Sequence, residues 1–421
     1  MRLLPSTPPP GPFRPGFWRS PLRGPWLTAA LGSVLLVLVA IVAVTGFLSH
    51  AAYNPGLGGN AIVDPGLDLP LTFDWPTGPS WLYAVTQGLH TNVGLAAIPV
   101  LLAKLWSVIP RLFAWPPVRS LAQGIERLSI ALLVSSAVFE FATGVLNMQY
   151  FYAFKFNFVV AHYYGAVVFV ASLVLHVAVK TPAIARAYRD RGVLRPLRDD
   201  LLRTRPEPAG DLVSPRPAAP TLSRRGLFGL VGAGAATLLL ANAGQSIGGP
   251  LRRLAVLAPR GQDLGDGPND FQVNKTARGA GVKPEMTGAA YRLELRGGRR
   301  AVRLRREQLL ALPQRTAELP IACVEGWSTT QTWTGVPLAA LARMAGVPHA
   351  RQALVESLQP AGVLSRSTLS ADQVAAADSL LALKVNGADL SLDHGFPARM
   401  IVPALPGVHN TKWVRRITFT A

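Results

Sequence analysis

The sequence has 421 residues, of which 49% are hydrophobic and 15% are charged, and its formal net charge is +19. Soluble globular proteins carry about 25% charged residues, so this composition excludes a wholly soluble chain. The chain contains one cysteine, Cys323, which excludes an internal disulfide and a cysteine-rich zinc site.

Five apolar stretches occur in the first 245 residues, and most of them approach the roughly 20 residues that cross a bilayer. The fifth is shorter and rich in Gly and Ala, so we predict four to five transmembrane helices. No comparable stretch follows Gln245. The five stretches are Leu27–Leu48, Trp81–Trp106, Ile130–Leu146, Tyr152–Val179 and Leu227–Leu240.

The basic residues alternate between successive connections, as the positive-inside rule requires. Residues 51–79 contain three aspartates and neither Lys nor Arg, whereas residues 181–225 contain ten arginines against five acids. We therefore predict a multi-pass protein of the cytoplasmic membrane with a cytoplasmic amino terminus and an extracytoplasmic carboxy-terminal domain. The basic residues before and after the first two spans are Arg2, Arg14, Arg19, Arg23, Lys104, Arg111, Arg119 and Arg127.

The segment before the fifth stretch has two features. Pro206–Pro220 is rich in Pro and Ala, which predicts a flexible linker. The sequence Ser-Arg-Arg-Gly-Leu-Phe follows at 223–228 and resembles a twin-arginine export signal placed internally. The alternative is that Arg224 and Arg225 only flank a membrane span.

Histidines inside the apolar stretches are candidate functional residues, because ionisable groups in a bilayer are costly. His162 and His176 are 14 residues apart, which is about 21 Å along a helix and nearly four full turns. His90 and His162 lie at matching depths below the starts of their stretches, so both could ligate one haem iron axially. His50 is the alternative to His90, and hydrogen bonding between helices is the alternative to haem binding.

The histidine spacing in the fourth stretch resembles that of membrane b-type cytochromes. The resemblance covers residues 24–180 and implies a four-helix, cytochrome b-like domain. No histidine of the first three stretches matches the depth of His176, so we expect one b-type haem, held by His90 and His162, rather than two.

The polar region after Gln245 predicts a mixed α+β domain. Residues 291–304 alternate about Gly297-Gly298, which predicts a hairpin. Short helices are expected at Glu307–Ala311 and Leu338–Ala345. Strands are expected at Leu380–Leu383, Ala398–Val402 and Val414–Thr420, and an apolar strand should lead to Cys323.

Two motifs in this region resemble the sulfite oxidase family of molybdopterin enzymes. Residues 319–328 read Leu-Pro-Ile-Ala-Cys-Val-Glu-Gly-Trp-Ser, and Trp-Thr-Gly-Val-Pro-Leu follows at 333–338. Residues 393–403 read Asp-His-Gly-Phe-Pro-Ala-Arg-Met-Ile-Val-Pro, and Gly-Val-His-Asn-Thr-Lys-Trp-Val follows at 407–414. The resemblance covers roughly residues 268–421 and implies a sulfite oxidase-type molybdopterin domain.

The resemblance implies specific roles for residues of these motifs. Cys323 corresponds to the thiolate ligand of molybdenum. Ser365 to Thr368 cover a further contact whose register is open, and His409 is expected to be a surface residue. The residues implied to bind the pterin cofactor are Asn274, His394, Arg399, Asn410, Thr411 and Lys412.

One departure from the family bears on the substrate. Sulfite-oxidising members follow the cysteine with arginines that bind the anion, whereas Val-Glu-Gly-Trp follows at 324–327 here. This variant is similar to the bacterial subgroup that contains the methionine sulfoxide reductase catalytic subunit. The resemblance implies reduction of a sulfoxide-like substrate by oxygen-atom transfer; oxidation of sulfite or another oxyanion is the alternative.

The predicted organisation is therefore a membrane-anchored molybdopterin oxidoreductase in one chain. Its partners are a small-molecule substrate, the membrane, and the quinone pool or another redox protein. Nucleic acid is not expected, because much of the positive charge lies in cytoplasmic connections. A cofactor-free scaffold is disfavoured, because Cys323, Arg399 and Lys412 occur together. The predicted parts are a four-helix membrane domain at 1–180, a basic cytoplasmic linker at 181–225, a fifth transmembrane segment at 226–245 and the oxidoreductase domain at 246–421.

Overall fold

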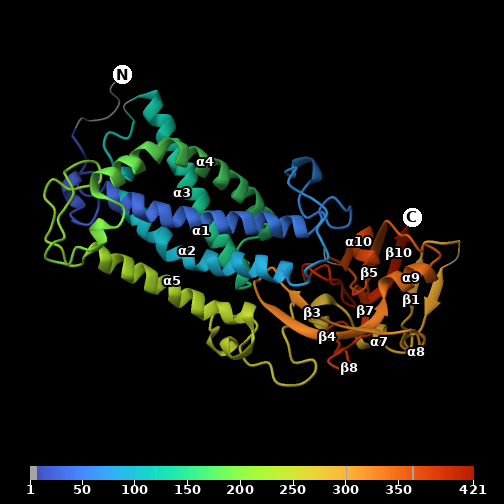
Figure 1. Ribbon diagram of the computed structural model, residues 1–421. Coiled ribbons are helices and arrows are strands. Elements are labelled where there is room, and N and C mark those ends of the chain that lie inside the picture. The colour runs from blue at the N-terminus through green and yellow to red at the C-terminus, as the bar shows by residue number, and fades with distance from the viewer. Residues whose placement is uncertain (1–6, 119, 300, 363–364) are drawn as a thin grey trace. The chain divides into compact units, whose positions relative to one another are not determined.

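The computed structural model describes residues 7–118, 120–299, 301–362 and 365–421 (Figure 1). Arg2 and Arg119, which belong to the predicted charge pattern, lie outside these ranges. The chain divides into two compact units. The first unit comprises residues 1–43 and 92–239, and the second comprises residues 44–91 and 240–421. The sequence assigned residues 44–91 to the membrane part, whereas the structure groups them with the carboxy-terminal domain.

Five helices are long and apolar enough to cross a membrane, which confirms the predicted helical region. Each continues past the carboxy-terminal end of its predicted stretch, because the residues after the apolar run remain helical. They are α1 (Pro25–Ala52), α2 (Leu82–Leu112), α3 (Leu121–Met148), α4 (Phe158–Arg191) and α5 (Arg224–Ile247).

The start of α4 differs from the prediction by six residues, and an N-cap explains the difference. Asn157 accepts hydrogen bonds at its side-chain oxygen from the amides of Val159 and Val160, at 3.0 and 3.2 Å. An Asn at this position satisfies amides that the first turn leaves without helical partners. His162 therefore lies in the second turn of α4, and residues 152–157 form no helix.

A buried polar cluster in the first unit involves the arginine pair at the start of α5. Arg224 is fully buried; its guanidinium donates to the Arg205 carbonyl at 3.0 Å and lies 3.9 Å from the Glu207 carboxylate. Glu207 also accepts a hydrogen bond from the Trp26 amide at 3.3 Å. Arg225 is exposed. Arg224 thus has a structural role in the folded chain, and the export role of the pair stays a prediction.

The carboxy-terminal domain contains two five-stranded sheets, with strand orders β2-β1-β10-β5-β6 and β3-β4-β7-β8, the latter joined by β9 through β7. Only β1 and β10 pair in parallel among the described strands. The strands are β1 (Leu293–Arg296), β2 (Val302–Leu304), β3 (Arg315–Ala322), β4 (Ser328–Pro337), β5 (Gln352–Ser357), β6 (Arg366–Ser370), β7 (Leu380–Val385), β8 (Ala388–Asp389), β9 (Arg399–Ile401) and β10 (Val414–Thr420).

Short helices connect these strands and the long helices. Helices α8 and α9 confirm the two predicted short helices to within one residue at each end. The short helices are α6 (Ala277–Ala280), α7 (Pro284–Thr287), α8 (Arg306–Leu310), α9 (Leu338–Met344), α10 (Ala371–Ala375) and the 3₁₀ turns η1 (Pro15–Phe17), η2 (Pro65–Leu67), η3 (Arg195–Leu197) and η4 (Gly249–Leu254).

The structure confirms the mixed α+β prediction and the hairpin of β1 and β2. The prediction had no strand at β5 or β6. Strand β6 is composed of Arg, Ser, Thr, Leu and Ser, a pattern without an apolar face. Ser367 and Thr368 are nevertheless buried, because neighbouring loops satisfy their polar groups.

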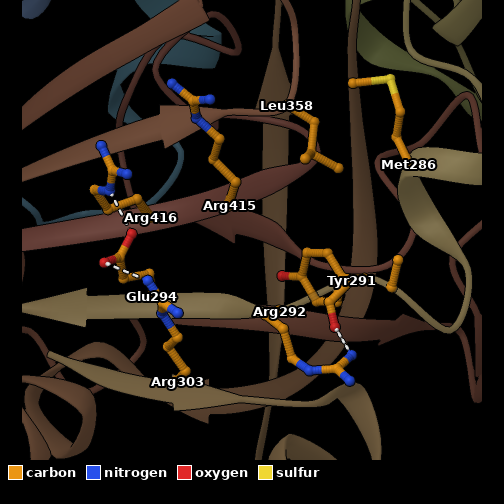
Figure 2. A pocket seen from close by; sticks show the side chains of 9 residues that line it. Met286, Tyr291, Arg292, Glu294, Arg303, Leu358, Arg415 and Arg416 are labelled. Atoms are coloured by element: carbon orange, nitrogen blue, oxygen red, sulfur yellow. Dashed lines mark hydrogen bonds and ion pairs between the residues drawn. The ribbon is translucent and has the colours of Figure 1, made fainter.

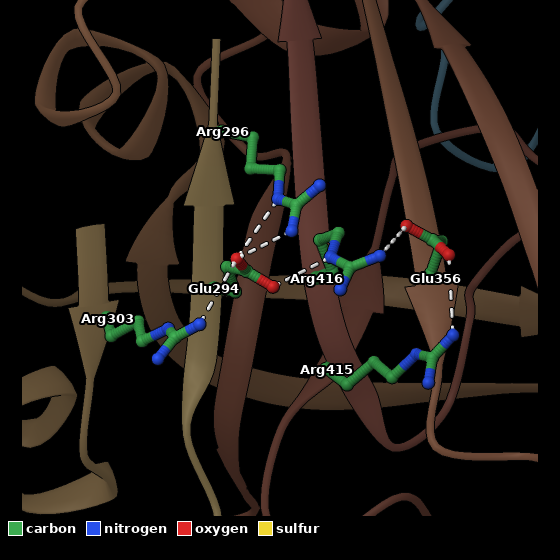
Figure 3. Close-up of polar contacts among 6 residues, drawn as sticks. All are labelled: Glu294, Arg296, Arg303, Glu356, Arg415 and Arg416. Atoms are coloured by element: carbon green, nitrogen blue, oxygen red, sulfur yellow. Dashed lines mark hydrogen bonds and ion pairs between the residues drawn. The ribbon is translucent and has the colours of Figure 1, made fainter. Parts of the chain in front are cut away.

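An ion-pair ladder crosses four strands of the first sheet (Figure 3). Strand register places Glu294 beside Arg303 and Arg416, and Arg416 beside Glu356. Arg416 lies 2.8 Å from the Glu294 carboxylate and 3.3 Å from that of Glu356. The Arg416 guanidinium lowers the pKa of Glu294. Such cross-strand pairs stabilise a sheet, so part of the positive charge of this domain is structural.

A pocket beside this ladder shares no residue with the cofactor motifs (Figure 2). Met286, Tyr291 and Leu358 form its apolar side. Arg292, on its rim, donates to the main-chain carbonyls of Ala289 and Tyr291, each at 2.6 Å. The arginines here are engaged by the protein itself, so the pocket is distinct from the candidate site.

The main apolar core of the second unit includes residues from both of its sequence segments. Ala52, Trp75 and Tyr83 are buried in one cluster with residues of the first sheet, such as Leu293 and Ile417. Fixing the segment 44–91 against the carboxy-terminal domain therefore removes apolar surface from water.

Candidate functional site

Cys323 lies in the tight turn that joins β3 to β4. The Cys323 amide donates to the Trp327 carbonyl at 2.9 Å, and the Gly326 amide donates to the Cys323 carbonyl at 3.0 Å. Gly326 has a φ of +95°, a conformation that favours glycine. The turn therefore holds the cysteine at one position, with 3% of the residue exposed. Strand β3 ends at Ala322, directly before the cysteine, which confirms the predicted strand.

The surroundings of Cys323 act on its thiol in opposite directions. Burial raises the pKa of Cys323. Hydrogen bonds from the main chain of Glu325 and Val324 lower it, as do the positive charges of Arg260 and Lys412. These donors and charges stabilise a thiolate, which is the form that binds a metal.

The carboxylate that follows the cysteine is held by the protein. Glu325 accepts a hydrogen bond from the Trp327 indole at 2.7 Å. The Arg260 guanidinium lies 3.2 Å from the same carboxylate. Arg260, whose charge acts on Cys323, is thus paired with an acid, which reduces its attraction for an anionic substrate.

Arg399, on β9, is buried and bonds to the main chain. Its guanidinium donates to the His394 carbonyl at 3.3 Å and lies over the Trp333 ring, 5.5 Å from the centroid. Burial lowers the pKa of Arg399 to about 9. A buried guanidinium with a carbonyl as its acceptor is costly unless an anion neutralises it.

Lys412 is the second buried cation of the site. Its ammonium donates to the carbonyls of Lys275 and Asp393, at 2.8 and 2.7 Å. Burial lowers the pKa of Lys412 well below its ordinary value, and the Arg399 charge lowers it further. Two neighbouring buried cations are residue types that suit a phosphate.

His394 is a neutral imidazole stacked against an aromatic ring. It lies 3.7 Å from the Phe271 ring, centroid to centroid, and its Nε2 donates to the Asn269 carbonyl at 2.9 Å. Burial lowers the pKa of His394 to about 3, and the charges of Arg399 and Lys412 add to this effect. Because Nε2 carries the proton, Nδ1 is an acceptor.

The loop before β10 is held by its own polar side chains. The Asn410 side-chain oxygen accepts from the Val402 amide at 2.8 Å, and the Thr411 hydroxyl lies 2.8 Å from that of Ser367. The prediction for His409 was wrong: this residue is 4% exposed, because Tyr53 packs edge-on against its ring at 5.2 Å.

Unsatisfied polar atoms test whether these residues fit a pterin cofactor. Within the part of the chain that the structure describes, four buried atoms of the site have no hydrogen-bond partner. Buried polar atoms are normally bonded, so their clustering indicates a polar ligand. The residues fit a cofactor that carries a phosphate. The four atoms are His394 Nδ1, Arg399 Nε, His409 Nδ1 and Asn410 Nδ2.

Comparison with known proteins agrees with this site. Residues 280–421 match the family model of the oxidoreductase molybdopterin binding domain. These residues form a molybdopterin-binding domain of the sulfite oxidase family. The match starts after Asn274 and includes Cys323 and the motifs at 319–338 and 393–414. The chain thus contains a molybdenum-dependent oxidoreductase domain.

Curated relatives show the same similarity. The uncharacterized oxidoreductase YuiH of Bacillus subtilis is 34% identical over 115 residues, which cover 27% of this chain and 57% of that protein. The catalytic subunit of protein-methionine-sulfoxide reductase, MsrP, of Gluconobacter oxydans is 34% identical over 143 residues, 30% of this chain and 46% of that protein. The NADH nitrate reductase of Volvox carteri is 29% identical over 174 residues, 34% of this chain and 20% of that protein. The chain thus spans between a fifth and three fifths of these relatives.

Asn274 lies at the edge of the molybdopterin domain and is partly buried. Its side-chain oxygen accepts from the Lys275 amide at 2.8 Å, and its carbonyl accepts from Arg260 at 2.6 Å. The structure therefore connects Asn274 to Glu325 through Arg260. Sequence reasoning missed Arg260, since it lies outside both motifs and no local pattern distinguishes it from other arginines.

Residues 44–91 contact the molybdopterin domain at the cysteine turn, which the sequence did not predict. The Gln87 amide donates to the Val324 carbonyl at 2.7 Å. Thr91 lies against Gly326, where a Cβ atom would meet its side chain. Neither contact has a local sequence signal, because each joins positions more than 230 residues apart.

The candidate haem ligands His90 and His162 lie in different units. His162 Nδ1 lies 2.9 Å from the Thr143 hydroxyl and 3.2 Å from the Glu140 carboxylate. These contacts orient the ring, as outer partners of metal-binding histidines do. His90 lies against Gly46 of α1, where a Cβ atom would approach its ring to 2.9 Å. His50 is bonded to Asp68 at 2.9 Å, so its ring already has a carboxylate partner.

Proposed function

We propose that this chain is a membrane-anchored molybdopterin oxidoreductase that reduces a small sulfoxide-like substrate. The observation that supports it most strongly is the combination of the Cys323 turn with two buried cations, Arg399 and Lys412. Both cations donate to main-chain carbonyls, and within the described residues neither forms an ion pair with a carboxylate. A cofactor with a phosphate would supply the missing charge.

The proposed roles follow from the geometry. Cys323 would hold molybdenum through its thiolate, and Arg399 and Lys412 would bind the cofactor phosphate. His394 Nδ1 would accept a hydrogen bond from the pterin, and Asn410 Nδ2 would donate one to it. When bound, the molybdenum cofactor supplies two-electron oxygen-atom transfer, and the protein supplies binding and orientation. In the described residues, no cluster of three or more His, Cys, Asp or Glu side chains could hold a metal instead.

The groups beside Cys323 support a sulfoxide-like substrate over sulfite. The buried Glu325 side chain accepts from Trp327 and pairs with Arg260, so the protein itself engages this guanidinium. Because Arg260 is paired and burial raises the pKa of Glu325 to about 8, this pair attracts an anion such as sulfite weakly, whereas a neutral sulfoxide needs no cation. The similarity to the MsrP catalytic subunit, which is named for protein methionine sulfoxide, favours the same substrate class.

We propose that one b-type haem, ligated by His90 and His162, delivers electrons from the quinone pool or another redox protein. The Thr143 and Glu140 contacts at His162 Nδ1 support this role, since they leave Nε2 as the ring nitrogen for iron. Gly46 beside His90 and Gly144 beside His162 lack a Cβ atom, which lets each imidazole ring lie close to the neighbouring helix.

The topology proposal places the segment 53–81 outside the cell and residues 192–223 inside. Because Cys323 is the only cysteine and is buried, introduced cysteines report topology without a background signal. We expect an impermeant maleimide to label Leu71→Cys in intact cells and to label Leu202→Cys only after lysis. Both positions are exposed. The reverse labelling pattern would invert the proposed topology.

The proposed function is tested on the purified full chain in detergent. We expect about one molybdenum per chain, a Soret band that His162→Ala removes, and turnover of dimethyl sulfoxide or methionine sulfoxide with reduced viologen. His176→Ala is the matched control, since it removes a histidine of the same helix and should leave the Soret band unchanged. Oxidation of sulfite with no sulfoxide turnover would establish the alternative direction, and protein without molybdenum would contradict the proposal.

A further inference from the structure

The turn that carries Cys323 is bonded to side chains of two long helices, all within the second unit. Near the start of α2, the Gln87 amide donates to the Val324 carbonyl at 2.7 Å. Near the end of α5, the Ser246 hydroxyl donates to the Gly326 carbonyl. Two carbonyls of the turn therefore take their donors from side chains that lie outside the matched molybdopterin domain.

The turn and the two helix ends also pack against one another. Gly326 has a φ of +95°, and a Cβ atom there would meet the Thr91 side chain of α2. A side chain at position 326 is thus excluded both by the conformation and by the space beside α2. A Cβ atom at Gly88 would lie 3.4 Å from the Ser246 side chain, so the ends of α2 and α5 lie in contact.

The burial of Gln87 has a cost that its bond to the turn explains. The residue is 2% exposed, and its side-chain oxygen has no hydrogen-bond partner within the described residues. An unmade bond at a buried acceptor is unfavourable, and an apolar side chain at this position would avoid it. The amide nitrogen gives the residue its role, because it supplies a donor to the Val324 carbonyl directly after the cysteine.

The bonds inside the turn connect these contacts to the cysteine. The Gly326 amide donates to the Cys323 carbonyl at 3.0 Å, and the Cys323 amide donates to the Trp327 carbonyl at 2.9 Å. A displacement of Gly326 or Val324 therefore moves the main chain of Cys323 with it. Functional groups need to be held to within about 0.5 Å, and outer partners that hold a metal ligand also tune the metal.

We propose that Gln87 and Ser246 are positioning residues that fix Cys323 as a ligand for molybdenum. The inference rests on the proposed function, because it takes the Cys323 thiolate as the metal ligand. Each residue acts through the main chain of the turn rather than through the metal. The ends of α2 and α5 thus complete a metal site whose ligand belongs to the molybdopterin domain.

The first test measures how fast the Cys323 thiol is labelled by a maleimide in full chain produced without the cofactor. Cys323 is the only cysteine and is buried, so labelling requires the turn to open. We expect Gln87→Met and Ser246→Ala each to raise the labelling rate about tenfold, since each removes one hydrogen bond to the turn. A rate equal to that of wild type in either variant would overturn the role of that residue.

The second test uses the full chain loaded with molybdenum. Both substitutions should shift the g values of the Mo(V) paramagnetic signal, because the sulfur ligand is no longer held in the same position. Unchanged g values in both variants would overturn the positioning role, even where labelling becomes faster.

Two controls separate positioning from general stability. Thr86→Val changes the buried neighbour of Gln87, whose hydroxyl donates to carbonyls of its own helix at 3.1 and 3.2 Å. Tyr291→Phe removes a buried hydroxyl bonded to the Val414 carbonyl at 2.6 Å, so it should lower the Tm. Neither control should change the labelling rate or the g values. A tenfold faster rate in Tyr291→Phe would show that labelling reports overall stability, and it would overturn the inference.

Failure of this inference is distinguishable from failure of the proposed function. Wild-type protein without molybdenum would overturn the proposed function, whereas the labelling comparison needs no metal and would still test the contacts of the turn. Molybdenum in the wild type, with labelling and g values unchanged in both variants, would overturn the inference while the proposed function stands.

Discussion

Replacing Cys323 by serine is expected to abolish oxygen-atom transfer while the chain still folds. The thiolate is the one protein ligand that we propose for molybdenum, and a serine hydroxyl in the same buried turn is a poorer donor to that metal. We expect the Mo(V) paramagnetic signal to change or disappear and kcat/KM to fall by at least about a thousandfold. The substitution changes one atom, so the hydrogen bonds of the turn at Cys323 and Gly326 should persist.

The control for this prediction is Ser328→Ala in the same hairpin. Ser328 donates to the Ser246 carbonyl at 2.7 Å and lies outside the proposed metal and cofactor contacts. This variant should lose some thermal stability and keep the molybdenum signal. A Cys323→Ser protein with an unchanged Mo(V) signal would show that another residue binds the metal.

Replacing Arg399 by methionine is expected to weaken cofactor binding and to stabilise the cofactor-free protein. Burial lowers the pKa of Arg399, which means that the folded domain disfavours the charged form. Below that pKa the charge destabilises the cofactor-free fold, so an apolar side chain of similar length should raise its Tm. The cofactor phosphate loses a charged donor, which we expect to cost about 2–4 kcal/mol, or roughly a 30- to 1000-fold increase in the cofactor Kd.

The opposite signs of these two effects make the prediction specific. Thermal denaturation with and without cofactor, combined with molybdenum analysis after dialysis, measures both. Arg415→Met is the matched control, because Arg415 is half-exposed and paired with Glu356 at 3.4 Å. It should change neither cofactor retention nor the Tm by much. If Arg399→Met retained molybdenum as wild type does, the phosphate would have to bind elsewhere.

Local sequence patterns were sufficient for the element types and for the motifs. The apolar runs predicted the five long helices, because a run of some 20 apolar residues has few stable alternatives. The ends of these helices were less predictable, since a single cap such as Asn157 decides where α4 begins. Strand β6 was missed for a related reason. Its residues are polar, and only its neighbours make their burial possible.

Some residues of the site were also identified from local motifs, whereas others depend on contacts between distant segments. Cys323, Arg399 and Lys412 were identified because they belong to two dense motifs, and the structure places all three in the molybdopterin domain. His409 was misassigned because a polar residue in a loop is usually exposed, whereas Tyr53 covers it. Arg260 was not identified because its partner, Glu325, is 65 residues away in the sequence.

The sequence by itself determined that the chain combines apolar helices with a polar oxidoreductase domain, and that its single cysteine lies in the chemical motif. The high hydrophobic fraction and much of the positive charge follow from the first 245 residues. Only the tertiary structure decided that residues 44–91 pack with the molybdopterin domain and bring Gln87 and Thr91 to the cysteine turn. The physical reason is that helix and strand signals depend on neighbours within a few residues, whereas burial and charge compensation depend on contacts between distant segments.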